Sequence, residues 1–504
     1  MKQDTVHRRK VVILGGGTAG WMAANLMATQ WQDQNIEITL LESPEIGIVG
    51  VGEGSTPQLK SFFDFIDVDE SEWMPACNAT FKNGISFKNW STKPGFDQYF
   101  HPFPSQTDDQ SAPAFFYNSF VRRKGVDVHA HPNRFFLSAH LAAHKLGPKP
   151  DYNFPFKMGY GYHFDAALVG KFLAKKAEER GVIHIEDKVT EVKLHDNGDI
   201  QSLSTAAGRQ LEGDLFVDCS GFAAILIQKT LKASFKTFGS NLFNDSAVVM
   251  PTPQDEDIGS ETISTAFSNG WAWEIPLINR KGNGYVYASA GCSGDQAEIE
   301  LRTTLGLLDS DVEARHLKMK VGRLENHWHH NCLAVGLSQG FIEPLEATAL
   351  HLVQETIQGF IEAYESGEFG DKNRKTFNQN INARFDAVRD YIVCHYRVNS
   401  RNDSEYWLAN ANNNQLSDSL KHILNTWMSG ANLSEEIERQ GIGKFYPSMS
   451  WHCLLAGYGI FPNQDQLMQP NDEAARYQMS DIDDFIQRCA LNFKGHRALL
   501  TPEQ

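Results

Sequence analysis

A glycine-rich turn near the start of the chain has the residue types and spacing of a dinucleotide-binding loop. Residues 15–20 read GGGTAG, so Gly15, Gly17 and Gly20 fall on the GxGxxG pattern. The first glycine permits a tight turn, the second lets the backbone approach a pyrophosphate, and the third allows close helix packing. Glu42 follows, where a carboxylate can accept a hydrogen bond from a ribose hydroxyl. An ordinary glycine turn would leave Glu42 unexplained, so the spacing predicts a bound dinucleotide and redox chemistry.

A second acidic position bears on which dinucleotide is bound. Residues 211–221 read LEGDLFVDCSG, which predicts one apolar strand that ends in Asp218. An acid there can meet the ribose or pyrophosphate of FAD, and the pattern resembles the second FAD element of glutathione-reductase-like flavoproteins. No second GxGxxG follows in the sequence, so we expect no built-in NADPH domain. Reducing equivalents would then have to arrive from another protein.

The elements that position these residues alternate between strands and helices. Apolar runs and flanking turn residues predict strands at 9–14, 36–41, 182–186, 271–278 and 285–290. Helical periodicity and capping residues predict helices at 21–31, 165–180 and 296–308. Hairpin turns are expected at 196–199 and at the Gly-Asn-Gly of 282–284. From Pro344 onward helices dominate, with Glu343 and Glu346 at the start of the first one.

Six motifs, taken together, resemble the flavin-dependent halogenases of the tryptophan halogenase type. They lie at 15–24 (GGGTAGWMAA), 50–57 (GVGEGSTP), 81–82 (FK), 163–166 (HFDA), 271–276 (WAWEIP) and 340–348 (GFIEPLEAT). The matches run in the family's order from near the N-terminus to Trp451, and so cover almost the full length. The resemblance therefore implies one fold and one reaction for the whole chain.

The fold that this resemblance implies is α/β. It consists of an FAD-binding Rossmann-like domain of the glutathione-reductase type, an inserted β-sheet region, and a mostly helical C-terminal region that covers the substrate. We expect the FAD-binding domain at 1–340, with the inserted sheet at about 80–160 and 240–330, and the helical cap over the substrate pocket at 341–504.

The reaction that the resemblance implies is electrophilic halogenation. Reduced FAD reacts with O2 to give a C4a-hydroperoxide, a halide attacks its distal oxygen, and hypohalous acid passes through a tunnel to Lys82. That lysine either donates a hydrogen bond to hypohalous acid or forms a haloamine, and both modes suit an ammonium that can lose its proton when desolvated. Glu346 matches the second catalytic residue, an acid that polarises the oxidant or helps remove the ring proton.

The resemblance also assigns binding residues. Contacts with FAD, bound as FADH2, are implied at Gly15, Gly17, Thr18, Ala19, Gly20, Glu42, Gly50, Val51, Gly52, Glu53, Asp218, Gly336 and Leu337. The segment 47–56 is implied as a flexible strap. Bromide or chloride is implied at Thr348 and Ala349, and the side chains that separate flavin from substrate are Trp271, Trp273, Ile275 and Pro276.

Several of these residues also have plainer interpretations. The sequence around Lys82 is typical of a solvated lysine, acids at a helix start are favoured by the helix dipole, and tryptophans two apart on a strand usually pack in a core. At 347–349 the chain has Ala-Thr-Ala where many family members have Ser-Thr-Gly. That difference removes a hydroxyl that could contact the lysine or the oxidant.

The substrate is the least determined part of the prediction. Trp451, Tyr406 and Trp407 lie in the region that resembles the pocket lining, and aromatic faces suit the stacking of an indole. The nearest match to a clamp for an amino acid's charged groups is 445–447 (FYP), which has no glutamate before Trp451. We therefore favour an indole or similar electron-rich arene over free tryptophan. A flavin-dependent aromatic monooxygenase and a non-catalytic flavin-binding protein are the alternatives.

Composition limits the partners and the compartment. The 504 residues, 41% hydrophobic, can bury a large core in more than one structural unit. A net charge of −16 without a basic stripe argues against nucleic acid and anionic membranes as partners. Seven cysteines without CxxC, and neither an apolar run of membrane length nor a signal peptide, favour a cytoplasmic protein with reduced thiols. The expected partners are a small aromatic substrate and a separate flavin reductase, with the protein a monomer or homodimer.

The segment 327–330 (HWHH) invites a metal-site interpretation. No second pair of ligands stands at a suitable spacing, and the flavin chemistry needs no metal. We therefore expect no metal there, and we expect histidines exposed on a strand or loop.

Overall fold

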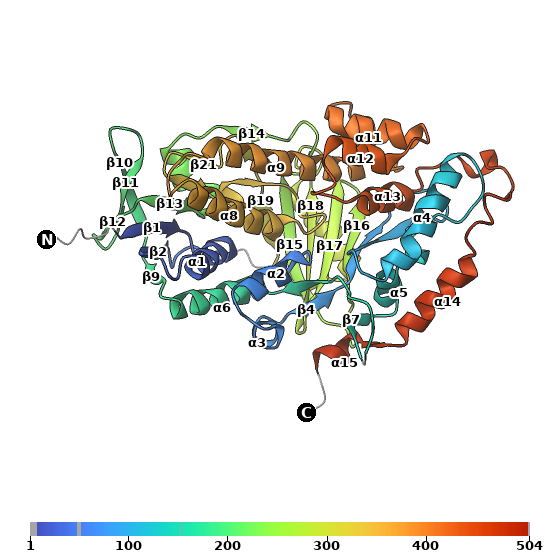
Figure 1. Cartoon of the computed structure of the whole chain (residues 1–504), viewed down its shortest axis with the longest axis horizontal. Coiled ribbons are helices and arrows are strands. Elements are labelled where there is room, and N and C mark those ends of the chain that lie inside the picture. The colour runs from blue at the N-terminus through green and yellow to red at the C-terminus, as the bar shows by residue number, and fades with distance from the viewer. Residues whose placement is uncertain (1–7, 48–51, 152, 502–504) are drawn as a thin grey trace. The chain divides into compact units, whose positions relative to one another are not determined.

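The computed structural model describes residues 8–47, 52–151 and 153–501 (Figure 1). Contacts divide the chain into two compact units, each assembled from three separate segments. Unit 1 comprises Met1–Ala79, Phe164–Phe238 and Met319–Asp386, and unit 2 comprises Thr80–His163, Gly239–Lys318 and Ala387–Gln504. The domain boundary expected at residue 340 stays a prediction.

A six-stranded sheet forms the centre of unit 1. Its order is β21 (Trp328–His329), β22 (Cys332–Ala334), β13 (Leu215–Asp218), β1 (Arg9–Leu14), β2 (Ile36–Glu42) and β9 (Ile183–Glu186). All neighbours are parallel except the β21–β22 pair. The VVIL run of β1 is buried because this strand lies in the middle of the sheet. The chain continues from β1 to β2 on one side, while β13 lies on the other, which makes the carboxyl end of β1 a switch point of the kind where nucleotides bind.

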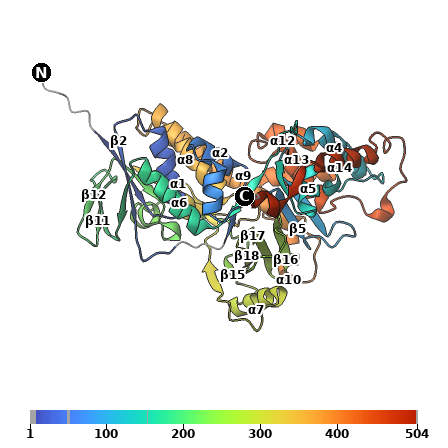
Figure 2. The same cartoon turned by 90° about the horizontal axis from the view of Figure 1, so that it is seen from below.

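Helices α1 (Thr18–Gln30), α6 (Ala166–Glu179) and α8 (Ala349–Ser366) pack together in unit 1, with α6 and α8 both against α1 (Figure 1 and Figure 2). Every residue of α1 from Gly20 to Ala28 is buried, as expected for a helix covered on several sides. The remaining helices of this unit are α2 (Gln58–Phe65), α3 (Glu70–Ala76) and the first part of α9 (Arg374–Arg397). The two helices and three strands predicted for this unit are confirmed to within a few residues.

Small sheets complete unit 1. One contains β10 (Val189–Leu194), β11 (Ile200–Thr205) and β12 (Gln210–Glu212), and another contains β14 (Phe235–Thr237), β20 (Gly322–Leu324) and β23 (Gly340–Phe341). The single strand expected over 211–217 is wrong, because β12 and β13 belong to different sheets. The chain breaks at Asp214, whose backbone N–H and carboxylate both bond to the backbone of Lys10. The predicted hairpin at 196–199 is confirmed between β10 and β11.

A seven-stranded sheet forms the centre of unit 2. Its order is β19 (Arg315–Lys318), β15 (Ser246–Pro253), β18 (Arg280–Tyr287), β17 (Gly270–Pro276), β16 (Thr262–Phe267), β5 (Gly84–Lys88) and β6 (Gln98–Pro102). Only the β16–β5 pair is parallel. Strand β4 (Thr80–Lys82) pairs antiparallel with β8 (Gly161–Phe164), and β7 (Leu146–Pro150) forms a two-stranded antiparallel sheet with β24 (Phe493–Gly495).

Helices surround this sheet. Helix α7 (Gly294–Leu305) packs on β15 and β18, beginning with a capping box formed by Ser293 and Gln296 (Figure 2). The other helices of unit 2 are α4 (Asp108–Arg123), α5 (Leu137–Ala143), α10 (Glu405–Ala411), α11 (Asp418–Met428), α12 (Leu433–Gln440), α13 (Ser448–Gly457), α14 (Met479–Ala490) and α15 (His496–Leu500). The α/β fold with a mostly helical C-terminal region is therefore confirmed.

The turn expected at 282–284 is wrong. Strand β18 runs straight through these residues, and the chain reverses earlier, where the Leu277 N–H donates to the Arg280 carbonyl over 2.8 Å. Tertiary packing explains the difference, since the Asn283 amide donates to Thr252 over 3.0 Å. A Cβ on Gly284 would lie 2.2 Å from the Trp273 ring. The glycine therefore makes room for the indole rather than for a turn.

Two general properties follow from the described residues. All seven cysteines are free thiols, as expected for reduced cysteines. None of the described helices has both the length and the apolar composition needed to cross a membrane.

Candidate active site

The predicted glycine loop lies at the carboxyl end of β1. Gly15 adopts a φ of +115°, which a side chain would strain, and a Cβ there would lie 2.3 Å from the Cys219 carbonyl oxygen. A Cβ on Gly20 would lie 1.9 Å from the Gly15 carbonyl oxygen. Gly17 caps α1 without a side chain, so the first N–H groups of this helix are left for an anion. These residues fit a pyrophosphate.

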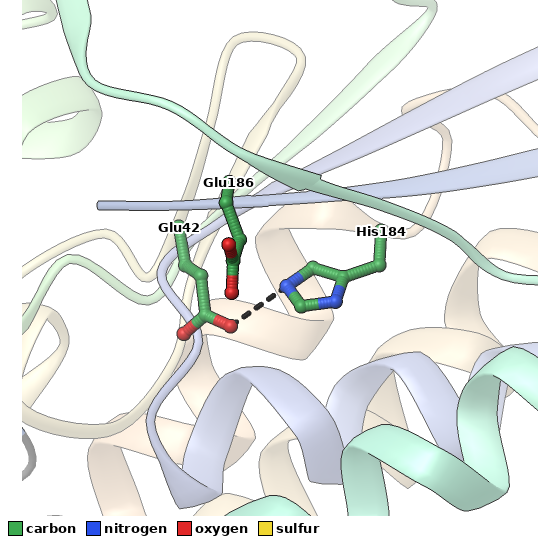
Figure 3. A group of neighbouring side chains, drawn as sticks. All are labelled: Glu42, His184 and Glu186. Carbon is green, nitrogen blue, oxygen red and sulfur yellow. Dashed lines mark hydrogen bonds and ion pairs between the residues drawn. The ribbon is translucent and has the colours of Figure 1, made fainter. Parts of the chain in front are cut away.

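Glu42 at the end of β2 lies over this loop. Its Oε2 is 1.6 Å from where a Cβ on Gly16 would be, so only glycine is accommodated beneath the carboxylate. Its Oε1 lies 2.7 Å from His184 Nε2 (Figure 3). On the other side of the ring, His184 Nδ1 lies 2.8 Å from Glu178. Glu42, His184 and Glu186 each have a possible metal-ligand atom, and these atoms lie within 4.8 Å of one another. The His184 Nε2 atom, however, already forms a hydrogen bond with Glu42. Glu178, His184 and Glu42 form a hydrogen-bonded chain that orients the Glu42 carboxylate.

Asp218 has no exposed surface, and its carboxylate is engaged by the chain itself. One oxygen accepts from the N–H and hydroxyl of Ser220, and the other accepts from the N–H groups of Leu226 and Ile227, all within 3.0 Å. Burial raises the pKa of Asp218, and these hydrogen bonds oppose that shift. The carboxylate holds the segment that follows β13.

Gly336 lies against the same loop. It has a φ of +71°, and a Cβ on it would lie 2.9 Å from the Ala19 Cβ. The structure thus brings together Gly15, Ala19, Gly20, Glu42 and Gly336 around the start of α1, where Thr18 is the first helical residue. Leu337 follows with 38% of its surface exposed.

The strap segment is described only in part. Gly50 and Val51 lie outside the described residues, whereas Gly52 is buried with a φ of +84° and Glu53 begins the short strand β3 (Glu53–Gly54). Desolvation by the surrounding protein raises the pKa of the Glu53 carboxyl to about 7, and the negative charge of Asp165 contributes to this rise to a smaller extent.

The region of Glu346 differs from the sequence prediction. Helix α8 begins at Ala349, so neither Glu343 nor Glu346 starts it. The left-handed backbone at Ala347, with a φ of +55°, separates them from the helix. Both carboxylates are buried, with 0% and 4% of their surface exposed. Thr348 stands at the N-cap of α8 with no side-chain capping bond, so the first N–H groups of this helix receive no bond from the cap side chain.

Lys82 is buried in unit 2. It ends β4, has 0% of its surface exposed, and places Nζ 5.5 Å from the centre of the Phe103 ring. Completely buried lysines are rare and concentrate at functional sites. Sequence reasoning missed Phe103, although the HPFP run of 101–104 puts an aromatic ring just after a strand.

The tryptophan pair lies on β17 as predicted. Trp271 is buried and Trp273 half-buried, with ring centroids 6.0 Å apart on one side of the strand. Ile275 and Pro276 are buried at the end of the same strand.

Comparison with known proteins decides the family. The tryptophan halogenase family model matches residues 10–473. A tryptophan 6-halogenase of Streptomyces toxytricini is 36% identical over 90% of both chains, and its crystal structure superposes with a TM-score of 0.85, covering 97% of this chain and 99% of that one. A 7-chloro-L-tryptophan 6-halogenase of Kutzneria sp. is 35% identical over 94% of this chain and 95% of its own. A flavin-dependent halogenase of Brevundimonas sp. superposes with a TM-score of 0.83 at 29% identity, covering 98% and 99%.

The chain belongs to the tryptophan halogenase family. It is therefore an enzyme, a flavin-dependent halogenase that uses reduced FAD, O2 and a halide.

The halogenase has an aromatic cluster around Trp451 in unit 2. Trp451 on α13 meets the Tyr391 ring edge-on, with centroids 4.8 Å apart, and Tyr391 stacks on Tyr446 at 3.8 Å. Tyr391 also lies 6.1 Å from the ring of His101, two residues before Phe103. This cluster contains Tyr446, the middle residue of the FYP segment singled out in the sequence.

Tyr406 and Trp407 belong to a neighbouring part of the halogenase core. The Tyr406 hydroxyl donates to Asn244 over 2.9 Å, and the Trp407 indole N–H donates to the Phe267 carbonyl over 2.7 Å. The Trp407 ring packs edge-on against Trp90 at 5.2 Å. Both rings also lie near the ring of Tyr396, at centroid distances of 6.4 Å and 6.2 Å, and their place in the pocket stays a prediction.

The prediction that the histidines of 327–330 are exposed is partly wrong. His327 is completely buried, stacks on Phe385, and bonds through Nε2 to Asn382 over 3.0 Å. Burial lowers its pKa to about 3. Tertiary packing of α9 thus makes His327 a core residue, while His329 and His330 are half-buried.

Proposed function

We propose that this halogenase places bromine or chlorine on an indole or a similar electron-rich arene, with Lys82 presenting the electrophilic halogen. The observation that carries the proposal is a lysine without exposed surface whose Nζ lies 5.5 Å from the centre of an aromatic ring. Removing an ammonium from water costs free energy, and proteins keep such groups mainly where they serve a function. A desolvated ammonium is also a strong hydrogen-bond donor, and a nucleophile once deprotonated.

Lys82 acts in one of two ways. As an ammonium it donates a hydrogen bond to the oxygen of hypohalous acid and polarises the O–X bond. As an amine it attacks the halogen, so that an N–X bond forms and the O–X bond breaks. In both modes the ring carbon then forms the C–X bond, the bond that held the halogen breaks, and the ring proton leaves to a base. The sum converts hypohalous acid and arene into haloarene and water.

Glu346 is proposed as the second catalytic residue. Its burial in a segment held by the turn at Ala347 keeps the carboxylate in a fixed position. A carboxylate in low-dielectric surroundings can hold or take up a proton near neutral pH. We assign to it the polarisation of the oxidant or the removal of the ring proton.

The cofactor site is proposed around the start of α1. Bound reduced FAD would supply hypohalous acid from O2 and halide. The first N–H groups of α1 would hold the pyrophosphate and Glu42 the ribose, while Gly336 supports Ala19. The Asp218 carboxylate is satisfied by the chain, so we propose that it acts indirectly, by holding the segment after β13.

Backbone N–H groups are proposed to bind the halide, and side chains of β17 to separate the cofactor from the substrate. Thr348 and Ala349, at the start of an 18-residue helix, offer N–H groups to an anion without a side-chain charge. Trp271, Trp273, Ile275 and Pro276 are proposed to keep the cofactor apart from the arene. A separate flavin reductase would supply the reduced flavin.

Free tryptophan is the second candidate substrate. The names of the Streptomyces toxytricini and Kutzneria relatives give tryptophan and 7-chloro-L-tryptophan as their substrates, which favours it. The FYP segment without a following glutamate favours an arene that lacks the amino acid's charged groups.

A product assay tests this proposal. The protein is incubated with FAD, a generic flavin reductase, NADH, O2, bromide or chloride, and an indole panel that includes tryptophan, and products are identified by mass spectrometry. We expect a monohalogenated product that requires halide and protein. An oxygenated product formed equally well without halide would instead establish an aromatic monooxygenase.

A further inference from the structure

His163 lies at the centre of a buried polar network that joins four strands of unit 2. It begins the HFDA motif, to which the resemblance assigns no role, and its imidazole has no exposed surface. Nδ1 lies 3.2 Å from the Thr80 hydroxyl, and Nε2 lies 2.9 Å from the Thr262 hydroxyl. The Thr80 hydroxyl in turn donates to the carbonyl of Pro276 over 2.7 Å. The network therefore connects the lysine strand β4 and its partner β8 to β16 and to the end of the tryptophan strand β17.

The hydrogen bonds fix the tautomer of this histidine. Because the Thr80 hydroxyl donates its only proton to a carbonyl, it must accept from His163, so Nδ1 carries the hydrogen. Nε2 then has a lone pair, which accepts from the Thr262 hydroxyl. The chain of donors runs in one direction, from Thr262 through His163 and Thr80 to Pro276.

The charge environment keeps this arrangement neutral. Burial lowers the pKa of His163 well below its ordinary value, and the positive charge of Lys82 lowers it further. A neutral imidazole avoids a second positive charge beside the lysine. It also keeps the Nε2 lone pair that the network needs.

A second neutral histidine holds the backbone of β4. The Phe81 N–H donates to His496 Nε2 over 3.1 Å, and His496 Nδ1 donates to the Gly259 carbonyl over 3.0 Å. Burial lowers the pKa of His496 to about 4. Next along the strand, the Asn83 side chain donates to the Ser260 hydroxyl over 2.9 Å. Residues on both sides of Lys82 are thus tied to the segment before β16.

The side-chain geometry relates this network to the lysine. Thr80 and Lys82 are two residues apart on β4 and share a face, and Thr80 stands directly opposite His163 on β8. Gly161 stands opposite Lys82 and offers no side chain that would restrain the lysine stem. Rotation or sliding of β4 is therefore resisted at Thr80.

We propose that His163 is a positioning residue for Lys82, which it holds in register with the tryptophan strand through Thr80. This inference rests on the proposed function, since it assigns a task to a residue that acts through the halogen-presenting lysine. Each member of the network belongs to unit 2. The expected consequence is specific: weakening the network misplaces Lys82 without changing how much hypohalous acid is produced.

The test measures how oxidised halogen divides between product and a scavenger. Thr80→Val removes the hydroxyl at nearly constant volume and breaks the link from His163 to Pro276. The variant reacts with the best indole of the panel in the presence of monochlorodimedone, which consumes hypohalous acid that escapes capture. We expect indole halogenation to fall by about 10- to 100-fold, as for a displaced catalytic group, while total oxidised halogen stays within about twofold. Thr80→Ser, which keeps the hydroxyl, should restore the wild-type division.

Two further variants complete the design. Thr265→Val, on the same strand as Thr262 but outside the network, should behave as wild type. Thr262→Val removes the far end of the network and carries the test if Thr80→Val does not fold, with a smaller shift in the same direction.

The outcomes separate the two proposals. An unchanged division in Thr80→Val and Thr262→Val, or a parallel fall of product and scavenged halogen in both, would overturn the positioning role of His163. Absence of halogenated product from the wild-type protein would instead overturn the proposed function.

Discussion

At the scale of residues, burial decides which side chains can take part in proton or halogen transfer. Lys82 and Glu346 are both buried, yet their local sequences are typical of a solvated lysine and of acids at a helix start. Sequence patterns report the neighbours along the chain, whereas Lys82 lies beside the ring of the distant Phe103, and its strand is held by His163 and His496. Only the family resemblance identified Lys82 and Glu346. Phe103 and the role of His163 required the tertiary structure.

Glu53 gives a prediction at this scale. Its pKa rises from 4.5 to about 7 on folding. Between these values the unfolded state has released the proton that the folded state keeps, so the folded protein loses stability as the pH rises through this window. Glu53→Gln removes the penalty and should stabilise the protein by about 2 kcal/mol at pH 8, with little gain at pH 4.5. Chemical denaturation at both pH values measures the difference.

An exposed glutamate of α8, Glu362, supplies the control for this experiment. Glu362→Gln should change stability equally at both pH values. A Glu53→Gln gain that does not depend on pH would contradict the assignment.

At the scale of elements, the local sequence does not show whether a glycine is needed for a turn or for close packing against a distant side chain. The GxGxxG loop was predicted correctly because its glycines serve both the turn and the close packing of α1. The turn predicted at the Gly-Asn-Gly of 282–284 is wrong, because Gly284 makes room for the Trp273 indole on the neighbouring strand. The presence of strands β17 and β18 was thus predictable from the sequence. The position at which the chain reverses between them depends on contacts between strands.

The glycine loop yields a matched pair of variants. Space is free within 4 Å of a Cβ on Gly17, whereas a Cβ on Gly20 meets the Gly15 carbonyl oxygen at 1.9 Å. Gly17→Ala should therefore change the free energy of unfolding by about 1 kcal/mol or less but weaken FAD binding by about tenfold or more. Gly20→Ala should destabilise the protein by about 2 kcal/mol or more even without flavin. Denaturation without flavin and fluorescence titration with FAD separate the two effects, and equal stability of both variants would refute the packing argument.

The tryptophan strand gives a second prediction for elements. A Cβ on Gly284 would lie 2.2 Å from the Trp273 ring, so Gly284→Ala must displace the indole. We expect a loss of about 1–3 kcal/mol of stability, as for other overpacked sites, with a shifted tryptophan emission. Thermal unfolding and fluorescence spectra measure both, and an unperturbed spectrum would show that Trp273 is not held by this glycine.

At the scale of the whole molecule, the α/β fold and the helical C-terminal region were predictable. Each unit is built from three distant segments. The inserted sheet expected at about 80–160 and 240–330 came from the family resemblance, because local sequence patterns do not report which distant segments pack together. His327 illustrates the consequence, since α9 buries a histidine that its local sequence presents as exposed.

Cofactor binding is coupled to the stability of the whole molecule. A ligand that binds only the folded state stabilises it by about 2.7 kcal/mol at 100 times its Kd. We expect saturating FAD to raise the Tm, and Glu42→Gln to reduce that rise while leaving the Tm without flavin nearly unchanged, because the carboxylate faces the loop and not the core. Differential scanning fluorimetry with and without FAD measures this coupling. An equal rise in both proteins would contradict the role of Glu42.

The most direct test of the account compares Lys82→Ala with Lys88→Ala. The two lysines lie on strands that follow one another along the chain, β4 and β5, but Lys82 is completely buried and Lys88 is only half-buried. Product is measured by mass spectrometry with bromide, reduced flavin and indole, alongside FAD binding. The account predicts that Lys82→Ala binds FAD normally and forms no bromoindole, whereas Lys88→Ala keeps wild-type activity. Bromination by Lys82→Ala at the wild-type rate would contradict it.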